Sequence, residues 1–151
     1  MKFLIRYIYQ ASRFLWLLLK PVSAGVRLLM ISDDQVLLVK HVYEPYWYIP
    51  GGAVERNESL EDAVRREALE EAGATLHDLQ LFGAYTNQER GKCDHVIVYL
   101  TQDFDLSCQG DDEIEFCQLF PIDDLPESMS LGSKNRIREY LAGKTNNYGA
   151  W

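Results

Sequence analysis

Cysteines are few in this chain, and their positions exclude two common kinds of stabilising site. The 151 residues include only Cys93, Cys108 and Cys117, with no Cys-x-x-Cys spacing among them. An odd number of widely spaced cysteines is typical of free thiols in a reducing compartment, and a small disulfide-bonded or zinc-bound domain needs a denser pattern. The sequence therefore predicts three free cysteines and a cytoplasmic protein.

Long apolar runs are also absent, since no stretch reaches the roughly twenty residues that a membrane-spanning helix needs. Residues 1–20 nevertheless stand apart, with four basic side chains, no acidic ones and many large apolar ones. We interpret them as a helix that Pro21 ends, because proline cannot continue the helical hydrogen bonds. This helix either packs on its own domain or on a second subunit of a homodimer, or it lies on an anionic membrane surface.

Basic charge is scarce over most of the chain. The net charge is −8, and residues 51–151 hold twenty acidic but only nine basic side chains. Binding of long nucleic acids needs a basic surface, so this composition argues against that function. Acidic surfaces are often simply solvated, but carboxylates also suit divalent cations that carry a phosphate-bearing small molecule.

Strand and helix patterns alternate along the chain after Pro21. The runs 26–31 and 36–42 flank an Asp33-Asp34 turn and predict a hairpin. With no linker to divide the chain, this alternation predicts one α/β (α+β) domain over residues 22–142, with a mixed sheet and a tail at 143–151. The other strand candidates are 79–85, 95–101 and 114–120, and the helix candidates are 59–72 and 131–141.

The helix predicted over 59–72 turns glutamates toward the core. With a rotation of about 100° per residue, Glu67 and Glu71 share the face of Leu60 and Val64, and Glu70 lies on its flank. Carboxylates on an inward face are costly unless a cation offsets their charge. The alternative is a solvated face on which the glutamates pair with arginines of the same helix. Periodicity alone leaves both interpretations open.

The residues around this helix form a dense motif. Residues 52–74 resemble the Nudix box, G-x5-E-x7-R-E-U-x-E-E-x-G-U, where U is aliphatic. The flanking segments 47–52 and 114–126 also resemble segments of that family, so the resemblance extends over roughly residues 22–142. The fixed positions of the box that fall in register are Gly52, Glu58, Arg66, Glu67, Glu70, Glu71 and Gly73.

The resemblance implies an α/β/α sandwich that hydrolyses a phosphoanhydride bond with Mg²⁺ or Mn²⁺. Water attacks a phosphorus atom while the metal neutralises developing charge. The general base is either a glutamate of the box or a carboxylate on the later loop 110–113, where we favour Glu113; a solvated acidic turn is the alternative. The roles implied for the box are metal binding by Glu70 and Glu71, a further ligand or proton acceptor in Glu67, loop or water-mediated metal contact by Glu58, a carbonyl ligand in Gly51, and orientation of a glutamate by Arg66.

Two residues outside the box are substrate candidates. Arg27 could reach a phosphate or face solvent, and Trp47 could stack on a base or simply pack. The three histidines show no metal-ligand spacing and receive no catalytic role. The markers of the ADP-ribose and diadenosine-polyphosphate subfamilies are missing, which leaves a MutT-like enzyme for nucleoside triphosphates or another nucleoside diphosphate derivative. The alternatives are a catalytically silent nucleotide sensor, disfavoured because every box glutamate is present, and a membrane-associated hydrolase of lipid-linked diphosphates.

Overall fold

The computed structural model describes residues 22–88, 93–144 and 146–151. The helix expected at residues 1–20 lies outside these ranges, so the membrane and homodimer roles stay predictions. No helix within the described ranges is long and apolar enough to cross a bilayer.

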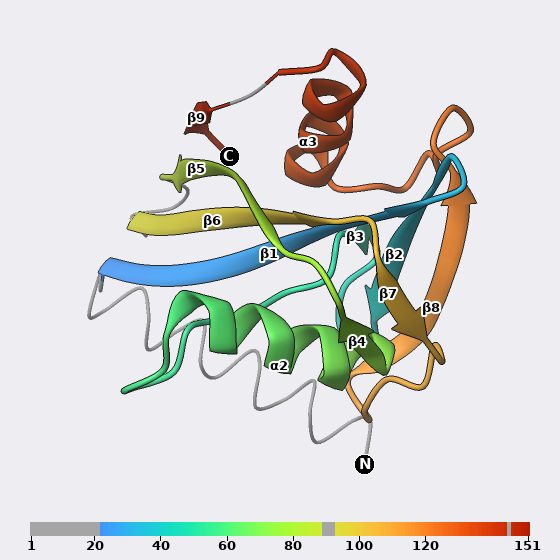
Figure 1. Ribbon diagram of the computed structural model, residues 1–151, viewed down its shortest axis with the longest axis horizontal. Helices are drawn as coiled ribbons and strands as arrows, with labels where there is room; N and C mark the ends of the chain where they lie inside the picture. The colour runs from blue at the N-terminus through green and yellow to red at the C-terminus, as the bar shows by residue number, and fades with distance from the viewer. Residues whose placement is uncertain (1–21, 89–92, 145) are drawn as a thin grey trace.

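A mixed seven-stranded sheet forms the centre of the molecule (Figure 1). Its order is β3-β2-β1-β6-β5-β9, and β8 pairs with β2. The β1–β6 and β5–β9 pairs are parallel and the others antiparallel, which confirms the predicted mixed sheet. The strands are β1 (Val22–Ser32), β2 (Gln35–His41), β3 (Trp47–Tyr48), β5 (Gln80–Asn87), β6 (Cys93–Thr101), β8 (Ile114–Pro121) and β9 (Asn147–Ala150).

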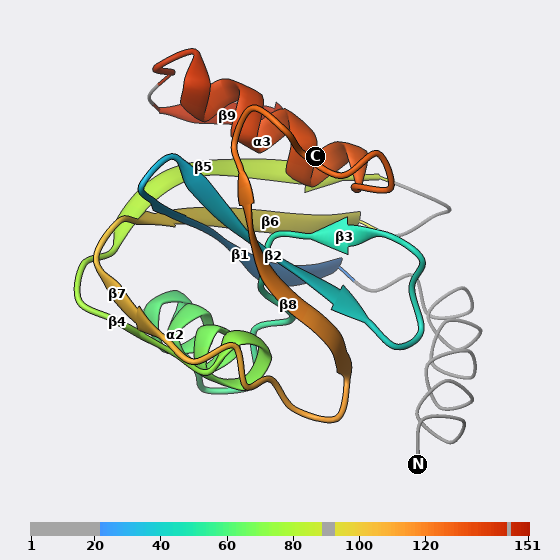
Figure 2. The same ribbon diagram turned by 90° about the vertical axis from the view of Figure 1, so that its right-hand side faces the viewer.

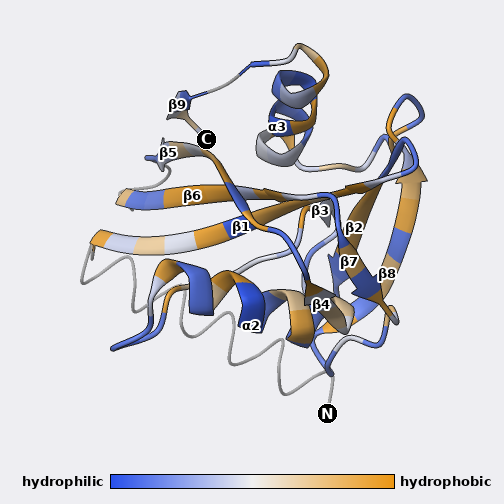
Figure 3. Ribbon diagram, in the orientation of Figure 1, coloured by the Kyte–Doolittle hydropathy of each residue, from blue (hydrophilic) through white to orange (hydrophobic). Residues whose placement is uncertain are grey.

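Two helices, α2 (Leu60–Ala72) and α3 (Leu131–Leu141), cover opposite faces of the sheet (Figures 1 and 2). Strand β1 is buried on both sides, because Leu28 belongs to the apolar cluster under α2 while Leu29 belongs to the cluster under α3. Apolar residues accordingly run along the central strands, as Figure 3 shows. The predicted α/β/α sandwich is confirmed.

The predicted hairpin of β1 and β2 is present, but the two strands pair only next to their turn. Further along, β1 bonds instead to the segment that leads into α2. The amide of Val26 donates to the carbonyl of Gly52, and that of Leu28 to the carbonyl of Pro50, each over 2.9 Å. This separation of β1 from β2 brings the start of the motif against β1.

The structure corrects three expectations. The tail expected at 143–151 contains β9, which pairs with β5 and extends the sheet. The short strands β4 (Ala74–Leu76) and β7 (Phe104–Leu106) form a separate two-stranded sheet that the sequence did not predict. Leu60, expected on the buried face of α2, is the first residue of the helix and is 37% exposed.

Candidate active site

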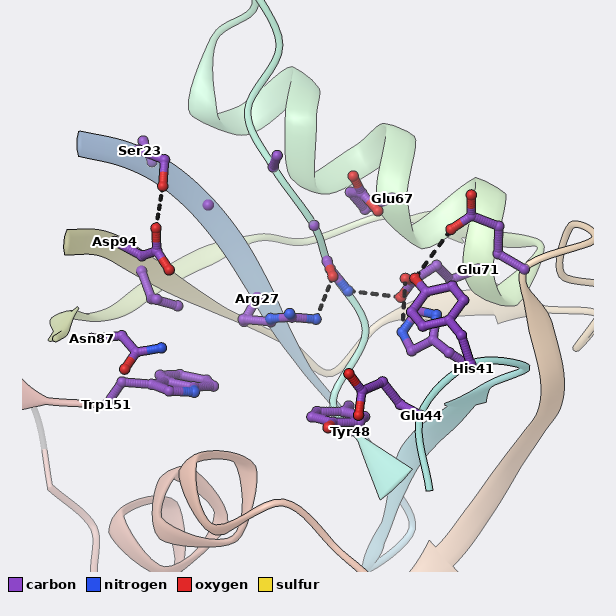
Figure 4. Close-up of a pocket in the computed structure, with 18 residues that line it drawn as sticks. Ser23, Arg27, His41, Glu44, Tyr48, Glu67, Glu71, Asn87, Asp94 and Trp151 are labelled. Atoms are coloured by element: carbon purple, nitrogen blue, oxygen red, sulfur yellow. Dashed lines mark hydrogen bonds and ion pairs between the residues drawn. The ribbon is translucent and has the colours of Figure 1, made fainter. Parts of the chain in front are cut away.

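Helix α2 directs two glutamates into a pocket beside β1. Ser59 caps its start by accepting the amide of Asp62, and Gly73, with φ 59°, ends it, as the sequence predicts. Between these ends, Glu67 and Glu71 are only 9% and 7% exposed and line the pocket (Figure 4). The inward placement predicted for both is confirmed.

Glu71 is held by contacts from two sides. Its Oε2 accepts the amide of Gly51 over 2.8 Å, and its Oε1 lies 3.4 Å from Nε2 of His41. Burial raises the pKa of Glu71 to about 8, which Arg27 partly opposes. Burial and the charge of Arg27 lower the pKa of His41 to about 4. His41 is therefore neutral near pH 7, and its contact with Glu71 is not an ion pair at that pH.

Arg66 gathers the other carboxylates of the motif. Its guanidinium donates to Glu58 and Glu67 over 2.8 Å and to Glu70 over 3.0 Å. These bonds, that to Glu58 foremost, raise the pKa of Arg66, so the group stays charged. The expected pairing of Arg66 is thus present, but Glu58 and Glu70 face Arg66 and do not line the pocket. Three carboxylates around one guanidinium leave an excess of negative charge beside the pocket.

The donor set fits a divalent ion in its chemistry. Burial also raises the pKa of Glu67, so two buried carboxylates face one pocket at an energetic cost that a hard cation would offset. Over residues 22–88, 93–144 and 146–151, no three His, Cys, Asp or Glu side chains are grouped to hold an ion. Glu70, a further ligand that the resemblance implies, is bonded to Arg66 in this structure.

Gly51 makes the close approach of the motif to β1 possible, and Gly52 leaves room for the side chain of Glu67. Gly51 has φ +133°, and a Cβ there would collide with the backbone of Val26; a Cβ on Gly52 would collide with the carboxylate of Glu67. The carbonyl of Gly51 accepts a hydrogen bond from Arg27. Arg27 therefore lies in the pocket rather than facing solvent, while a metal bound to the Gly51 carbonyl would share that oxygen with its guanidinium.

The two remaining candidates differ in their placement. Glu113, in the turn before β8, lines the pocket and accepts the hydroxyl of Tyr43 over 3.2 Å. Trp47 does not line it; its ring packs edge-on against Phe120 with centroids 4.8 Å apart. Of the two placements that the sequence left open for Trp47, the structure therefore shows packing rather than a position from which it could stack on a base. Neighbouring strand residues face opposite sides, and in β3 it is Tyr48 that faces the pocket.

A polar row at the far end of the pocket escaped the sequence analysis. Asp94 on β6 is in register with Ser23 on β1 and with Asn87 on β5. It accepts a hydrogen bond from Ser23. Trp151 follows β9, and its amide donates to Thr86 over 3.1 Å, which brings its indole beside Asn87 (Figure 4). The predicted strands ended at residue 85 and began at 95, so extending both would have revealed the Asn87–Asp94 pair.

His41 was also missed as a pocket residue, because its contact with Glu71 depends on how β2 meets α2 in space. Together these groups line a pocket of about 620 Å³, a size suited to a small molecule. It contains acidic groups at one end, Arg27 between, and the polar row with Trp151 at the other (Figure 4).

In metal-free buffer the free energy of unfolding is expected to fall between about pH 6.5 and 8. Burial raises the pKa of Glu71 from its ordinary 4.5 to about 8 in the folded state, so the folded state binds the extra proton and loses stability as pH rises through this range. His41, whose pKa is lowered from 6.5 to about 4, has the opposite effect, but only below about pH 6.5.

Melting temperatures measured with EDTA at pH 6.5, 7.25 and 8 would check this expectation. The Glu71→Gln variant should show a flatter profile, since it lacks the titrating group. A melting temperature that rises steadily with pH over this range would contradict the assignment.

Comparison with known proteins agrees with this arrangement. The model of the NUDIX domain family matches residues 20–140. An ADP-ribose pyrophosphatase of Methanocaldococcus jannaschii is 29% identical over 118 residues, which cover 75% of this chain and 69% of that protein. An uncharacterized Nudix hydrolase of Bacillus subtilis is 42% identical over 55 residues, covering 36% of this chain and 35% of its own length.

Solved structures show the same fold. A MutT NUDIX hydrolase from Burkholderia pseudomallei matches with a TM-score of 0.70 and 27% identity, covering 78% of this chain and 97% of that one. A NUDIX hydrolase from Nitrosomonas europaea matches with a TM-score of 0.72 and 26% identity, covering 83% and 93%. With the family model spanning most of the chain, this protein belongs to the Nudix family and is a Nudix pyrophosphohydrolase.

Proposed function

We propose that the protein hydrolyses a phosphoanhydride bond in a nucleoside diphosphate derivative, such as a nucleoside triphosphate, with Mg²⁺ or Mn²⁺. The observation that carries this proposal is the composition of one pocket. It joins the buried carboxylates Glu67 and Glu71 to Arg27 and then to a polar row that ends at Trp151. A nucleoside diphosphate derivative would match this order, with its metal-bound phosphates at the carboxylates and Arg27 and its base at the polar row and Trp151.

At the acidic end, Glu67, Glu70 and Glu71 would hold the ion, with the carbonyl of Gly51 and, through water, Glu58 as further ligands. A bound divalent ion supplies charge neutralisation at the phosphoryl oxygens and a lowered pKa for water. Side chains of the protein orient the ligands and accept the proton. Arg66 fixes the orientation of Glu67. Glu113 or Glu67 accepts the proton of the attacking water.

Arg27 and the polar row would position the rest of the substrate. Arg27 and Ser23 lie on one face of β1, four residues and so about 13 Å apart, which suits the length of a diphosphate with its ribose. Asp94 can accept hydrogen bonds from a base, Asn87 can both donate and accept them, and the Trp151 indole offers a face for stacking.

A substrate panel tests the proposal directly. Nucleoside triphosphates, ADP-ribose, dinucleotide polyphosphates, nucleotide sugars, capped RNA and lipid-linked diphosphates would be incubated with Mg²⁺ or Mn²⁺, with EDTA as the control. We expect hydrolysis of a nucleoside diphosphate derivative that EDTA abolishes. ADP-ribose is included because the relative from Methanocaldococcus jannaschii is named an ADP-ribose pyrophosphatase. Nucleotide binding without turnover would instead identify a catalytically silent sensor, and preference for a lipid-linked diphosphate would overturn the nucleoside assignment.

Replacing Trp151 with alanine is expected to raise KM for the nucleotide about ten-fold and to leave kcat nearly unchanged. Loss of one base–aromatic stacking contact costs roughly 1–3 kcal/mol, and this contact is far from the reacting bond. Steady-state kinetics of the best substrate would measure it. Tyr148→Ala is the matched control, since Tyr148 lies on β9 but is 88% exposed and outside the pocket. Equal effects of both changes would argue against base stacking.

For residues 1–20 we propose an attachment role, either to a second subunit or to an anionic membrane, on the basis of their basic and apolar composition. Co-sedimentation with anionic vesicles, with and without these residues, separates the two. Partitioning that does not change on deletion would rule out the membrane role.

A further inference from the structure

Two of the three cysteines lie in contact away from the substrate pocket. Cys117 is on β8 and Cys108 is in the segment between β7 and β8, where its φ is +51°. Their Sγ atoms are 2.9 Å apart and both residues are free thiols. A disulfide bond is about 2.05 Å long, so the sulfurs need to approach by only about 0.9 Å to form one.

The segment that carries Cys108 packs on the end of the catalytic helix. The hydroxyl of Ser107 donates to the carbonyl of Gly73 over 3.1 Å. The amide of Asp111 donates to the carbonyl of Glu70 over 2.8 Å. Between them, a Cβ on Gly110 would lie 2.5 Å from the carbonyl oxygen of Glu71. Movement of this segment therefore acts directly on the last turn of α2.

The two thiols differ in exposure. Cys108 is exposed, whereas Cys117 is partly buried against the apolar cluster under α2. Burial raises the pKa of Cys117, with contributions from Cys108 and from the charge of Glu71. Cys108 is thus the sulfur that an oxidant reaches first, and Cys117 is the partner that completes the bond.

We propose that Cys108 and Cys117 are a reversible oxidation site, and that closing their disulfide lowers the hydrolase activity. Hydrogen peroxide oxidises the Cys108 thiol to a sulfenic acid and releases one water. The Cys117 sulfur then attacks the sulfenic sulfur, the S–S bond forms, and the hydroxyl leaves with the thiol proton as a second water. The pair loses two electrons to the peroxide, and a dithiol reductant returns them.

The link to activity rests on the proposed function of Glu70 and Glu71. Closing the bond pulls the segment at Cys108 toward β8, and the segment is bonded to the helix turn that carries both glutamates. A misplacement of about 1 Å in an active site can reduce a rate by about a hundred-fold. We therefore expect a fall in turnover of at least about ten-fold.

Counting thiols tests the bond without any substrate. The full chain is reduced, desalted, treated with hydrogen peroxide, and alkylated after unfolding. We expect one alkylated cysteine, Cys93, and a peptide cross-link between Cys108 and Cys117 that dithiothreitol removes. In the Cys93→Ser variant we expect none. A cross-link that includes Cys93, or three thiols alkylated after treatment, would overturn the proposal.

The same samples test the consequence for catalysis. Turnover of the reduced protein should fall on oxidation and return with dithiothreitol, also in Cys93→Ser, but it should resist this treatment in Cys108→Ser, whose substitution is at an exposed site. If the bond forms and turnover does not change, the effect on activity is overturned. If no substrate is turned over in the reduced state, the proposed function fails, while the thiol count still decides the oxidation site.

Discussion

Replacing Glu71 with glutamine is expected to lower turnover by about three orders of magnitude and to stabilise the metal-free protein. The amide keeps the acceptor for Gly51 but loses the charge that would bind the ion, whose contribution of several kcal/mol corresponds to such a factor. The same change removes a buried carboxyl whose pKa is about 8. Burying that group lowers the free energy of unfolding by about 3 kcal/mol near pH 7, and the amide does not carry this cost. Steady-state kinetics and thermal melting in EDTA measure both effects.

Glu61→Gln is the matched control, because Glu61 lies on the same helix but pairs with Arg65 at the surface, outside the pocket. We expect this variant to retain both turnover and melting temperature. Turnover of the Glu71→Gln variant at nearly the unmodified rate would overturn the proposed metal site. A lowered melting temperature would show instead that Glu71 contributes to stability through its contacts.

Replacing Arg66 with alanine is expected to reduce stability and catalysis together. Removal of the guanidinium leaves Glu58, Glu67 and Glu70 without a shared partner, and Glu67 is buried. We expect a loss on the order of 2 kcal/mol, less than for a fully buried pair because the Arg66 side chain is 24% exposed. Turnover should fall by about ten- to a hundred-fold, as for other residues that orient metal ligands.

Arg65→Ala tests whether the position of the charge matters or only its number. Arg65 is adjacent in sequence but pairs with Glu61 on the exposed side and donates one hydrogen bond to the carbonyl of Leu76, away from the pocket. Its loss should lower the free energy of unfolding by about 1 kcal/mol and leave turnover unchanged. Denaturant unfolding in EDTA and Mg²⁺-dependent kinetics compare the two variants. Similar losses in both would contradict the specific role of Arg66.

The parts of the site that could be predicted depend on local signals. Helix α2 begins after Ser59 and ends before Gly73, and α3 matches the predicted 131–141, because capping residues and periodicity act within a few residues. The inward face of Glu67 and Glu71 follows from the same rotation per residue. The metal-binding role expected of both glutamates came from the resemblance of residues 52–74 to the Nudix box.

The other end of the pocket depends on contacts that no local pattern encodes. Asp94 meets Ser23 only because β1 and β6 pair in one particular register, and Trp151 reaches the pocket only because β9 joins β5. For the same reason the sequence left two placements open for Trp47, since the face of a two-residue strand depends on its partner. Spatial order across strands, rather than sequence order, determines these neighbours.

The parallel pairing of β1 with β6 has a consequence for how the protein folds. Ser23 and Asp94 are 71 residues apart, and β1 is also the strand against which the turn at Gly52 is held. Contacts between residues so far apart in sequence form slowly, because the chain loses much conformational entropy before they stabilise it. The catalytic helix can form early from local interactions, but the pocket exists only after this long-range pairing is complete. Grafting residues 52–74 alone onto another scaffold would therefore transfer the helix without its pocket.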